Sequence, residues 1–131
     1  MRTLIVEDDF TSRLLLQAFL SRYGECHVAI NGKEAVEAFR LSLKNGRRYN
    51  LVCMDIMMPE MDGQEAVREI RALEERVGIL STSGARIMMI TALDDVKNVV
   101  TSFKALCDAY VFKPVDTAQL LNQLKSLELV P

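Results

Sequence analysis

Three carboxylates in this chain fall where they could act together on one ligand. Glu7 and Asp8 directly follow the apolar run 4–6, and Asp55 directly follows the apolar run 51–54. If the two runs are neighbouring strands of a parallel sheet, these side chains meet at its carboxyl edge. Like charges at such distances raise one another's pKa values unless a cation joins them. Oxygen ligands without His or Cys favour Mg²⁺, for which Mn²⁺ could substitute.

Two polar residues occupy similar positions in the second half of the chain. Thr91 ends the apolar run 86–91, where its hydroxyl could bond an incoming anion. Lys113 follows the run 109–112, where its ammonium could pair with a carboxylate or a phosphoryl oxygen. Strand ends often carry polar residues, so any one of these side chains could be an ordinary surface group. Their convergence favours a site, because few polar groups usually gather in one place.

The elements that must position these side chains alternate along the chain. Short apolar runs typical of buried strands lie at 4–6, 27–30, 51–54, 86–91 and 109–112. Amphipathic stretches typical of helices follow them, at about 10–22, 32–45, 63–76, 95–103 and 117–127. This order predicts an α/β, flavodoxin-like (βα)5 fold, a doubly wound parallel sheet of strand order 2-1-3-4-5 with helices on both faces. The first and third strands are then neighbours.

Local features of these elements give more specific expectations. The spacing in the first helix predicts an inner face made of Leu14, Leu15, Ala18 and Phe19. Asp9 is expected to cap this helix and not to bind a metal ion. His27 lies away from the acidic cluster, so we expect it to be structural. Asp116 and Gln119 have the spacing of a capping box at the start of the last helix.

Composition limits the classes of protein to consider. The 131 residues favour one domain over 1–131, and 50% apolar with 26% charged residues is typical of a soluble protein. The net charge of −2 gives no reason to expect direct binding of nucleic acid, and no apolar run is long enough for a membrane span. Cys26, Cys53 and Cys107 have no metal-type spacing, which favours free thiols in a reducing cytoplasm.

The motifs at the strand ends identify a family. The chain resembles the receiver domain of bacterial two-component response regulators over nearly its whole length. The motifs are Leu-Ile-Val-Glu-Asp-Asp at 4–9, Met-Asp-Ile-Met-Met-Pro at 54–59 with Asp62 and Gly63, Ile-Thr-Ala at 90–92, and Tyr-Val-Phe-Lys-Pro at 110–114. Each motif alone is weak, but all of them, in this order and at strand ends, are specific.

The resemblance implies a role for each residue of the acidic cluster. Asp55 would accept a phosphoryl group from the phosphohistidine of a sensor histidine kinase or of a phosphotransfer protein. Asp8 and Asp55 would hold Mg²⁺ together with the main-chain carbonyl of Met57, and Glu7 would act through metal-bound water. Lys113 would pair with the phosphoryl group. Such a chain is no conventional metabolic enzyme, but it would catalyse its own phosphorylation and its autodephosphorylation.

The resemblance also implies a conformational switch. Thr91 would bond a phosphoryl oxygen and move toward it, and Tyr110 would fill the space that it leaves. The alternative for Tyr110 is an ordinary half-buried residue with its hydroxyl in water. The Lys113–Pro114 bond is a candidate cis peptide. The changed face would consist of the fourth helix, fifth strand and fifth helix, around Val99, Phe103, Tyr110 and Leu120. It would control an unknown downstream protein and could form a phosphorylation-dependent dimer.

Two features depart from the usual pattern of the family. Met57 and Leu93, two positions past Asp55 and Thr91, flank the path of the attacking water, and neither side chain can orient a water by a strong hydrogen bond. We therefore expect slow autodephosphorylation. The segment before the fourth strand looks longer than usual, and its Ser-Thr-Ser-Gly at 81–84 favours a mobile loop.

Other classes of protein fit less well. A haloacid-dehalogenase-type phosphatase needs an Asp-x-Asp pair after its first strand, which Asp8-Asp9-Phe10 does not provide. A flavodoxin needs a phosphate-binding loop rich in Ser, Thr and Gly at that place. A receiver-like module that binds proteins without being phosphorylated remains an alternative, as does a fragment of a larger regulator. We expect residues 1–131 to form the receiver domain alone, with no output domain.

Overall fold

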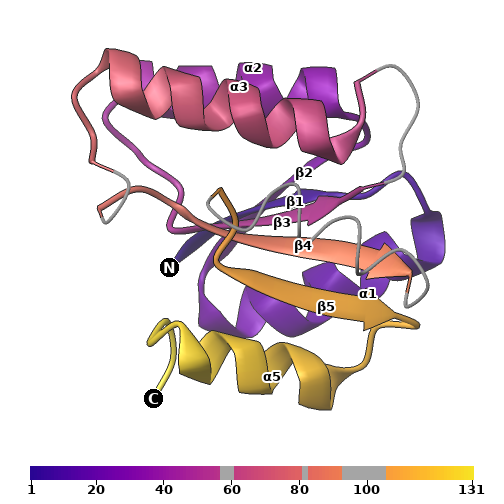
Figure 1. Ribbon diagram of the computed structural model, residues 1–131. Coiled ribbons are helices and arrows are strands. Elements are labelled where there is room, and N and C mark those ends of the chain that lie inside the picture. Colours follow the sequence, from indigo (N-terminus) through magenta and orange to yellow (C-terminus); the bar gives the residue numbers. More distant parts are fainter. Residues whose placement is uncertain (57–60, 81–82, 93–105) are drawn as a thin grey trace.

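The computed structural model describes residues 1–56, 61–80, 83–92 and 106–131, and it forms a parallel sheet between two layers of helices (Figure 1). The strands are β1 (Arg2–Val6), β2 (Glu25–Ala29), β3 (Leu51–Asp55), β4 (Arg86–Ala92) and β5 (Ala109–Lys113). They lie in the order β2-β1-β3-β4-β5, and all pairs are parallel. The predicted α/β fold and strand order are confirmed.

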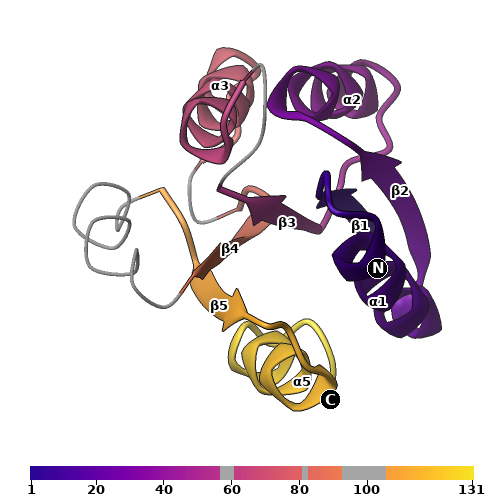
Figure 2. The same ribbon diagram turned by 90° about the vertical axis from the view of Figure 1, so that its right-hand side faces the viewer.

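Helices cover both faces of the sheet, as the end-on view of Figure 2 shows. The helices are α1 (Phe10–Leu20), which a short 3-10 turn (Ser21–Tyr23) extends, α2 (Gly32–Lys44), α3 (Gly63–Arg76) and α5 (Thr117–Ser126). α2 and α3 lie on one face, and α1 and α5 lie on the other. The helix predicted at 95–103, with Val99 and Phe103, lies outside the described residues. No helix in the described part is long and apolar enough to cross a bilayer.

The core consists of two apolar layers, one on each side of the sheet. Successive side chains along each strand point to opposite faces of the sheet. Leu4, Val52 and Ile87 therefore face α2 and α3, while Ile5 and Cys53 face α1 and α5. Both sides of β1 and β3 are therefore buried, which explains why their sequences are continuously apolar. β2 lies at one edge of the sheet and is only partly buried.

The inner face predicted for α1 is wrong in part. Leu16, Phe19 and Leu20 are buried, whereas Leu14 is 48% and Leu15 36% exposed. Ala18 is exposed as well. The helix has apolar residues around most of its circumference, so spacing alone fits more than one face, and the turn from β1 into α1 decides which one meets the sheet.

The helices begin at side-chain caps. Asp9, Asn31, Asp62 and Asp116 each accept a hydrogen bond from the main-chain N–H three residues on, at 2.8, 2.8, 2.9 and 2.8 Å. Asp9 therefore caps α1, as predicted. Because every cap follows the carboxyl end of a strand, the caps fix where each helix leaves the edge that carries the acidic cluster.

Candidate functional site

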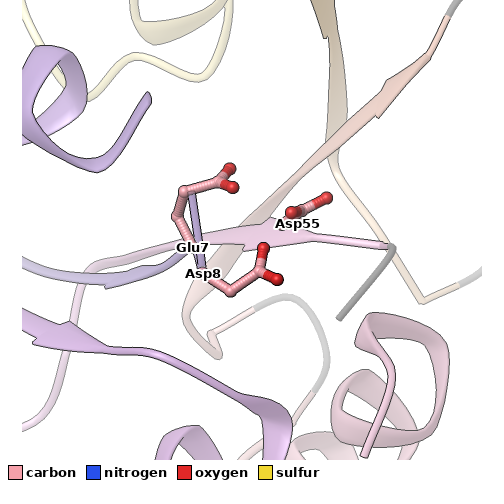
Figure 3. A group of neighbouring side chains, drawn as sticks. All are labelled: Glu7, Asp8 and Asp55. Atoms are coloured by element: carbon pink, nitrogen blue, oxygen red, sulfur yellow. The ribbon is translucent and has the colours of Figure 1, made fainter. Parts of the chain in front are cut away.

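Three acids meet at the carboxyl edge of the two central strands. Asp55 ends β3, and Glu7 and Asp8 follow β1, its neighbour in the sheet. Figure 3 shows their carboxylates turned toward a common space, and one oxygen of each lies within 4.8 Å of those of the others. Glu7 is fully buried, Asp55 is 2% exposed, and Asp8 is exposed. The arrangement leaves one open side, next to Asp8.

Close main-chain packing holds Asp55 in place. Gly63, the first residue of α3, donates its N–H to the carbonyl of Ile56 at 3.0 Å. A Cβ on Gly63 would collide with the main-chain oxygen of Asp55. Gly32 likewise donates its N–H to the carbonyl of Met61, at 3.1 Å, and a Cβ on Gly32 would collide with that Met61 carbonyl oxygen. The amino ends of α2 and α3 can approach the site because both residues are glycines.

The turn after β1 is fixed by its own hydrogen bonds. The N–H of Glu7 donates to the carbonyl of Ala29 on β2, at 3.1 Å. The carboxylate of Glu7 accepts from the N–H of Asp9, and its main-chain carbonyl accepts from Arg13, both at 3.1 Å. The Glu7 side chain is thereby directed inward, and the cap residue Asp9 is directed away from the cluster.

Lys113 supplies positive charge from the end of β5. Its Nζ lies 3.2 Å from Asp55 Oδ2 and 3.4 Å from Glu7 Oε1. Burial alone would lower the pKa of the Lys113 ammonium, but the charges of Asp55 and Glu7 and its bonds to both raise it above the usual value. One ammonium thus faces three carboxylates. The peptide bond between Lys113 and Pro114 is cis.

The pKa of Glu7 is raised by its burial and by the neighbouring negative charge. Its burial, followed by its hydrogen bond with Asp55 and the charge of Asp55, raises its pKa from 4.5 to about 7. Its second oxygen, Oε2, is buried and has no hydrogen-bond partner among the described residues. An unpartnered buried carboxylate oxygen beside two more carboxylates fits a cation, and oxygen ligands alone fit Mg²⁺.

Thr91 and Tyr110 lie on adjacent strands next to the cluster. Thr91 is 3% exposed and follows Ile90, the partner of Asp55 in the β3–β4 register. Tyr110 pairs with Met89, so Thr91 and Tyr110 point to the same face of the sheet. The hydroxyl of Tyr110 is buried and has no partner in the described part of the chain, so the alternative of a hydroxyl in water is wrong.

Some site residues cannot be placed, and one contact was not foreseen. Met57 and Leu93 lie outside the described residues. Half of the predicted capping box forms, since the N–H of Gln119 donates to Asp116 at 2.8 Å. The side-chain amide of Gln119 does not return to Asp116 N–H; it accepts from the N–H of Phe112 at 2.8 Å and donates to the carbonyl of Phe112 at 3.2 Å. Gln119 thereby fixes the residue before Lys113. The bonds between Gln119 and Phe112 depend on how α5 packs beside β5. The spacing of Gln119 from Asp116 is the same whether its amide caps the helix or binds Phe112, so it could not have revealed them.

A doubly wound parallel sheet with a buried aspartate at the end of its third strand, two acids after its first and a lysine at the end of its fifth is the arrangement of a receiver-type fold. The family model for the response regulator receiver domain matches residues 3–125. The chain belongs to this family, the receiver domains of two-component response regulators.

Individual relatives agree with this assignment. The chain is 36% identical over 129 residues to the regulatory protein VanRB of Enterococcus faecalis, covering 97% of this chain and 52% of the relative. The receiver domain of Saccharomyces cerevisiae Ssk1, solved with the phosphotransfer protein Ypd1, is 29% identical with a TM-score of 0.78, covering 95% of this chain and 86% of that one. The receiver domain of the Arabidopsis thaliana histidine kinase CKI1, solved with Mg²⁺ and BeF₃⁻, is 28% identical with a TM-score of 0.76 and coverage of 98% and 90%.

The matched region is a part of the longer curated relatives. The chain spans about half of their length, for example 47% of the probable transcriptional regulator ycf27 of Cyanophora paradoxa, to which it is 34% identical. The similarity therefore concerns the receiver portion of those proteins.

Proposed function

We propose that this chain is a phosphorylation-activated signalling switch that accepts a phosphoryl group on Asp55. The observation that carries the proposal is the position of Asp55, buried at a strand end between the carboxylates of Glu7 and Asp8 and the ammonium of Lys113, 3.2 Å away. The donor is the phosphohistidine of a sensor histidine kinase or of a phosphotransfer protein. The chain acts in the cytoplasm, in keeping with its free cysteines.

The acids of the cluster fit a divalent cation. Asp8 and Asp55 would bind Mg²⁺ directly, together with the main-chain carbonyl of Met57, and Glu7 would contribute through a bound water. Mn²⁺ could take the same place. When bound, the ion neutralises the carboxylates and the incoming phosphoryl oxygens. The unpartnered Oε2 of Glu7 supports this assignment, because an acceptor buried without a donor needs a positive partner.

The residues of the chain then carry the transfer. An oxygen of Asp55 attacks phosphorus in line, the bond from phosphorus to the donor histidine nitrogen breaks, and the electron pair stays with the imidazole, which takes up a proton. Lys113 transfers its ion pair from the Asp55 carboxylate to a phosphoryl oxygen, and the hydroxyl of Thr91 donates to another. Water later hydrolyses the acyl phosphate and restores Asp55.

The α1 side of the site offers a surface for the phosphodonor. Phe10 is 64%, Leu14 48% and Leu15 36% exposed, and these residues adjoin a recess of about 420 Å³. The recess is lined by Thr11, Ser12, Leu15, Lys113, Pro114 and Val115. A clustered exposed apolar face marks a protein interaction site, and this one lies beside Lys113 and hence close to Asp55.

Thr91 and Tyr110 form the switch. Their side chains share one face of adjacent strands, and among the described residues the buried Tyr110 hydroxyl has no partner, which costs free energy in the unphosphorylated state. Movement of Thr91 toward a phosphoryl group would let Tyr110 repack and so change the face of the fourth helix, β5 and α5. This face controls a downstream protein and can support a phosphorylation-dependent dimer. Apolar Met57 and Leu93 make the activated state long-lived.

The phosphoacceptor is tested with acetyl phosphate and Mg²⁺, and the product is measured by intact mass. We expect the mass of one phosphoryl group in the wild-type protein and none in Asp55→Asn. Asp116→Asn, which alters the exposed cap of α5, is the matched control and should be phosphorylated normally. No mass shift under any condition would favour the alternative, a receiver-like module that binds proteins without phosphorylation.

The switch is tested with beryllofluoride and Mg²⁺, read from amide chemical shifts. In the wild-type protein, shifts are expected at β3 and along β5. In Thr91→Ala the shifts around Asp55 should persist while those of β5 are largely lost. β5 shifts that match the wild type in this variant would contradict a switch through Thr91.

A further inference from the structure

Arginines from separate segments lie together at the edge of the sheet that is formed by the amino-terminal ends of the strands, opposite Asp55. The strands begin at this edge, which lies at the left in Figure 1. Arg2 begins β1, Arg47 and Arg48 lie in the turn before β3, and Arg86 begins β4. Hydrogen bonds through Asn50 join them: its N–H donates to the carbonyl of Arg2 at 2.8 Å, and its carbonyl accepts from the N–H of Arg86 at 2.9 Å.

These arginines outnumber the carboxylates that face them. Glu25 pairs with both Arg2, at 3.2 Å, and Arg47, at 3.1 Å. Asp108 lies 3.5 Å from Arg86, but its carboxylate also pairs with another arginine on α3, at 3.0 Å. The guanidinium of Arg48 donates to the main-chain oxygen of Ser83 at 2.8 Å and forms no ion pair within the described residues. The edge is therefore positive, although the whole chain has a net charge of −2.

Two recesses give this positive edge a shape. One, of about 310 Å³, is lined by Arg2, His27, Ala38, Leu41, Ser42, Asn45, Arg47 and Tyr49. The other, of about 250 Å³, is lined by Arg48, Tyr49, Asn50, Ser83, Gly84, Arg86 and Leu129. Among the described residues, no carboxylate lines either recess, and Tyr49 lines both.

Tyr49 keeps the edge in a defined conformation. Its side chain is 5% exposed, its hydroxyl lies 2.6 Å from Nδ1 of His27, and the guanidinium of Arg2 lies over its ring at 5.0 Å. Nε2 of His27 in turn lies 2.9 Å from Glu25. The arginines are thus partly ordered before any ligand arrives, which lowers the entropic cost of binding.

We propose that this arginine edge, formed by Arg2, Arg47, Arg48 and Arg86, docks an acidic segment of a partner protein. Guanidinium groups bind carboxylates through two parallel hydrogen bonds, and two recesses that both adjoin Tyr49 suit an extended peptide better than one small anion. A single-stranded nucleic acid needs exposed aromatic rings on which bases stack, and Tyr49 is buried. The edge lies at the far end of the strands from Asp55, so docking and phosphoryl transfer can occur together.

The probe is a short fluorescent peptide of alternating glutamate and glycine, titrated at low salt and followed by anisotropy. The wild-type protein should bind it, and added salt should weaken the binding. Arg47→Ala with Arg48→Ala should weaken it about tenfold, the effect of losing two exposed charge contacts. Lys33→Ala with Arg40→Ala, which removes the same charge from exposed positions of α2, should change it little.

Further variants separate this proposal from others. Asp55→Asn should bind the peptide like the wild type, since the edge does not depend on phosphorylation. Circular dichroism of the Arg47→Ala with Arg48→Ala variant, compared with the wild type, should show that the variant is folded. Equal affinity in the two double variants, or absence of binding to the wild type, would overturn the proposal. Tighter binding of a single-stranded oligonucleotide than of the peptide would overturn it in favour of a nucleic-acid surface.

Discussion

Glu7 has the least favourable environment of the acids in the candidate site. It is fully buried, one of its oxygens has no partner within the described residues, and Lys113, which pairs with it, is shared with Asp55. A neutral glutamine at this position would remove the buried negative charge of the Glu7 carboxylate, but it would also remove the carboxylate oxygens that the proposed cation needs. The same residue therefore makes the metal-free protein less stable and the site more attractive to a cation.

The proposed role of Met57 and Leu93 beside the path of the attacking water gives a prediction on lifetime. Met57→Asn with Leu93→Glu should speed the decay of the phosphorylated protein, because polar side chains there can orient the attacking water. The loss of the phosphoryl mass is followed after acetyl phosphate is removed. Met57→Leu serves as the control and should decay like the wild type. Equal decay rates in all three proteins would refute a role for these positions.

At the residue scale, sequence reasoning located the acids but not their environments. Glu7, Asp8 and Asp55 could be placed together because strand order decides which strand ends are neighbours. That Glu7 is buried and Asp8 exposed depends on hydrogen bonds from Asp9 and Arg13 to Glu7, which spacing does not reveal.

The glycine at the start of α3 couples that helix to the end of β3, which carries Asp55. Gly63→Ala should lower the free energy of unfolding by about 1–3 kcal/mol, because its Cβ would push against the main chain of Asp55. Phosphorylation by acetyl phosphate should also slow, since Asp55 would shift. Gly46→Asn is the matched control, because nothing lies near its Cβ and asparagine tolerates a φ of 71°. Similar losses in both variants, measured by urea unfolding, would rule out the coupling.

A largely buried ion network joins α3 to the segments that precede β4 and β5. Glu74 is 3% exposed, accepts from Arg71 at 2.6 Å and accepts from the N–H of Ala85 at 2.8 Å. Arg71 also donates to the carbonyl of Leu106 at 3.0 Å and to Asp108 at 3.0 Å. Sequence reasoning missed Glu74 because a glutamate in a helix is normally exposed.

Removing one member of this network should be costly. Glu74→Ala should lower the free energy of unfolding by about 1–3 kcal/mol, since it leaves the N–H of Ala85 without its acceptor and removes one of the two carboxylates paired with Arg71. The adjacent Glu75→Ala, at an exposed position, should change it by less than about 0.5 kcal/mol. Urea unfolding of both variants provides the measurement, and equal values would mean that the network adds no stability.

At the element scale, strands were easier to predict than helix faces. β1, β3, β4 and β5 appear where the apolar runs lie, because burial on both sides leaves a continuous signal. β2, at an edge, begins at Glu25 although the apolar run suggests 27, since its first residues pair with the main chain of β1. The face of α1 was wrong because its apolar residues surround most of the helix.

The charge of Glu7 should be visible in the stability of the whole molecule. Without metal, its folded pKa of about 7 exceeds the value of 4.5 that it has when unfolded. The folded state then binds more protons than the unfolded state between these values. The free energy of unfolding should therefore fall as pH rises from about 5 to 7, and the contribution of Glu7 should be constant above that.

This pH dependence is measured by urea unfolding in chelator across the range from 5 to 8. Asp9, Glu25, Glu37 and Asp116 have lowered pKa values, so their contributions are lost only in more acidic solution. Glu7→Gln should lose the decline, which assigns it to this residue. Saturating Mg²⁺ should remove or reverse it, because a bound cation requires the charged carboxylates. A decline of the same size in Glu7→Gln would contradict the assignment.

Within the described residues, the acidic cluster and the arginine edge place opposite charges at the two ends of the strands, so these two groups together form a dipole along the strand axis. A charged partner at a distance experiences this dipole before it makes any contact, and it is turned as it approaches. Basic surfaces are guided toward the end that holds Asp55, and acidic surfaces toward the opposite end. A phosphoryl group on Asp55 enlarges the dipole, so that the chemical state of one residue changes how the whole protein is oriented in encounters.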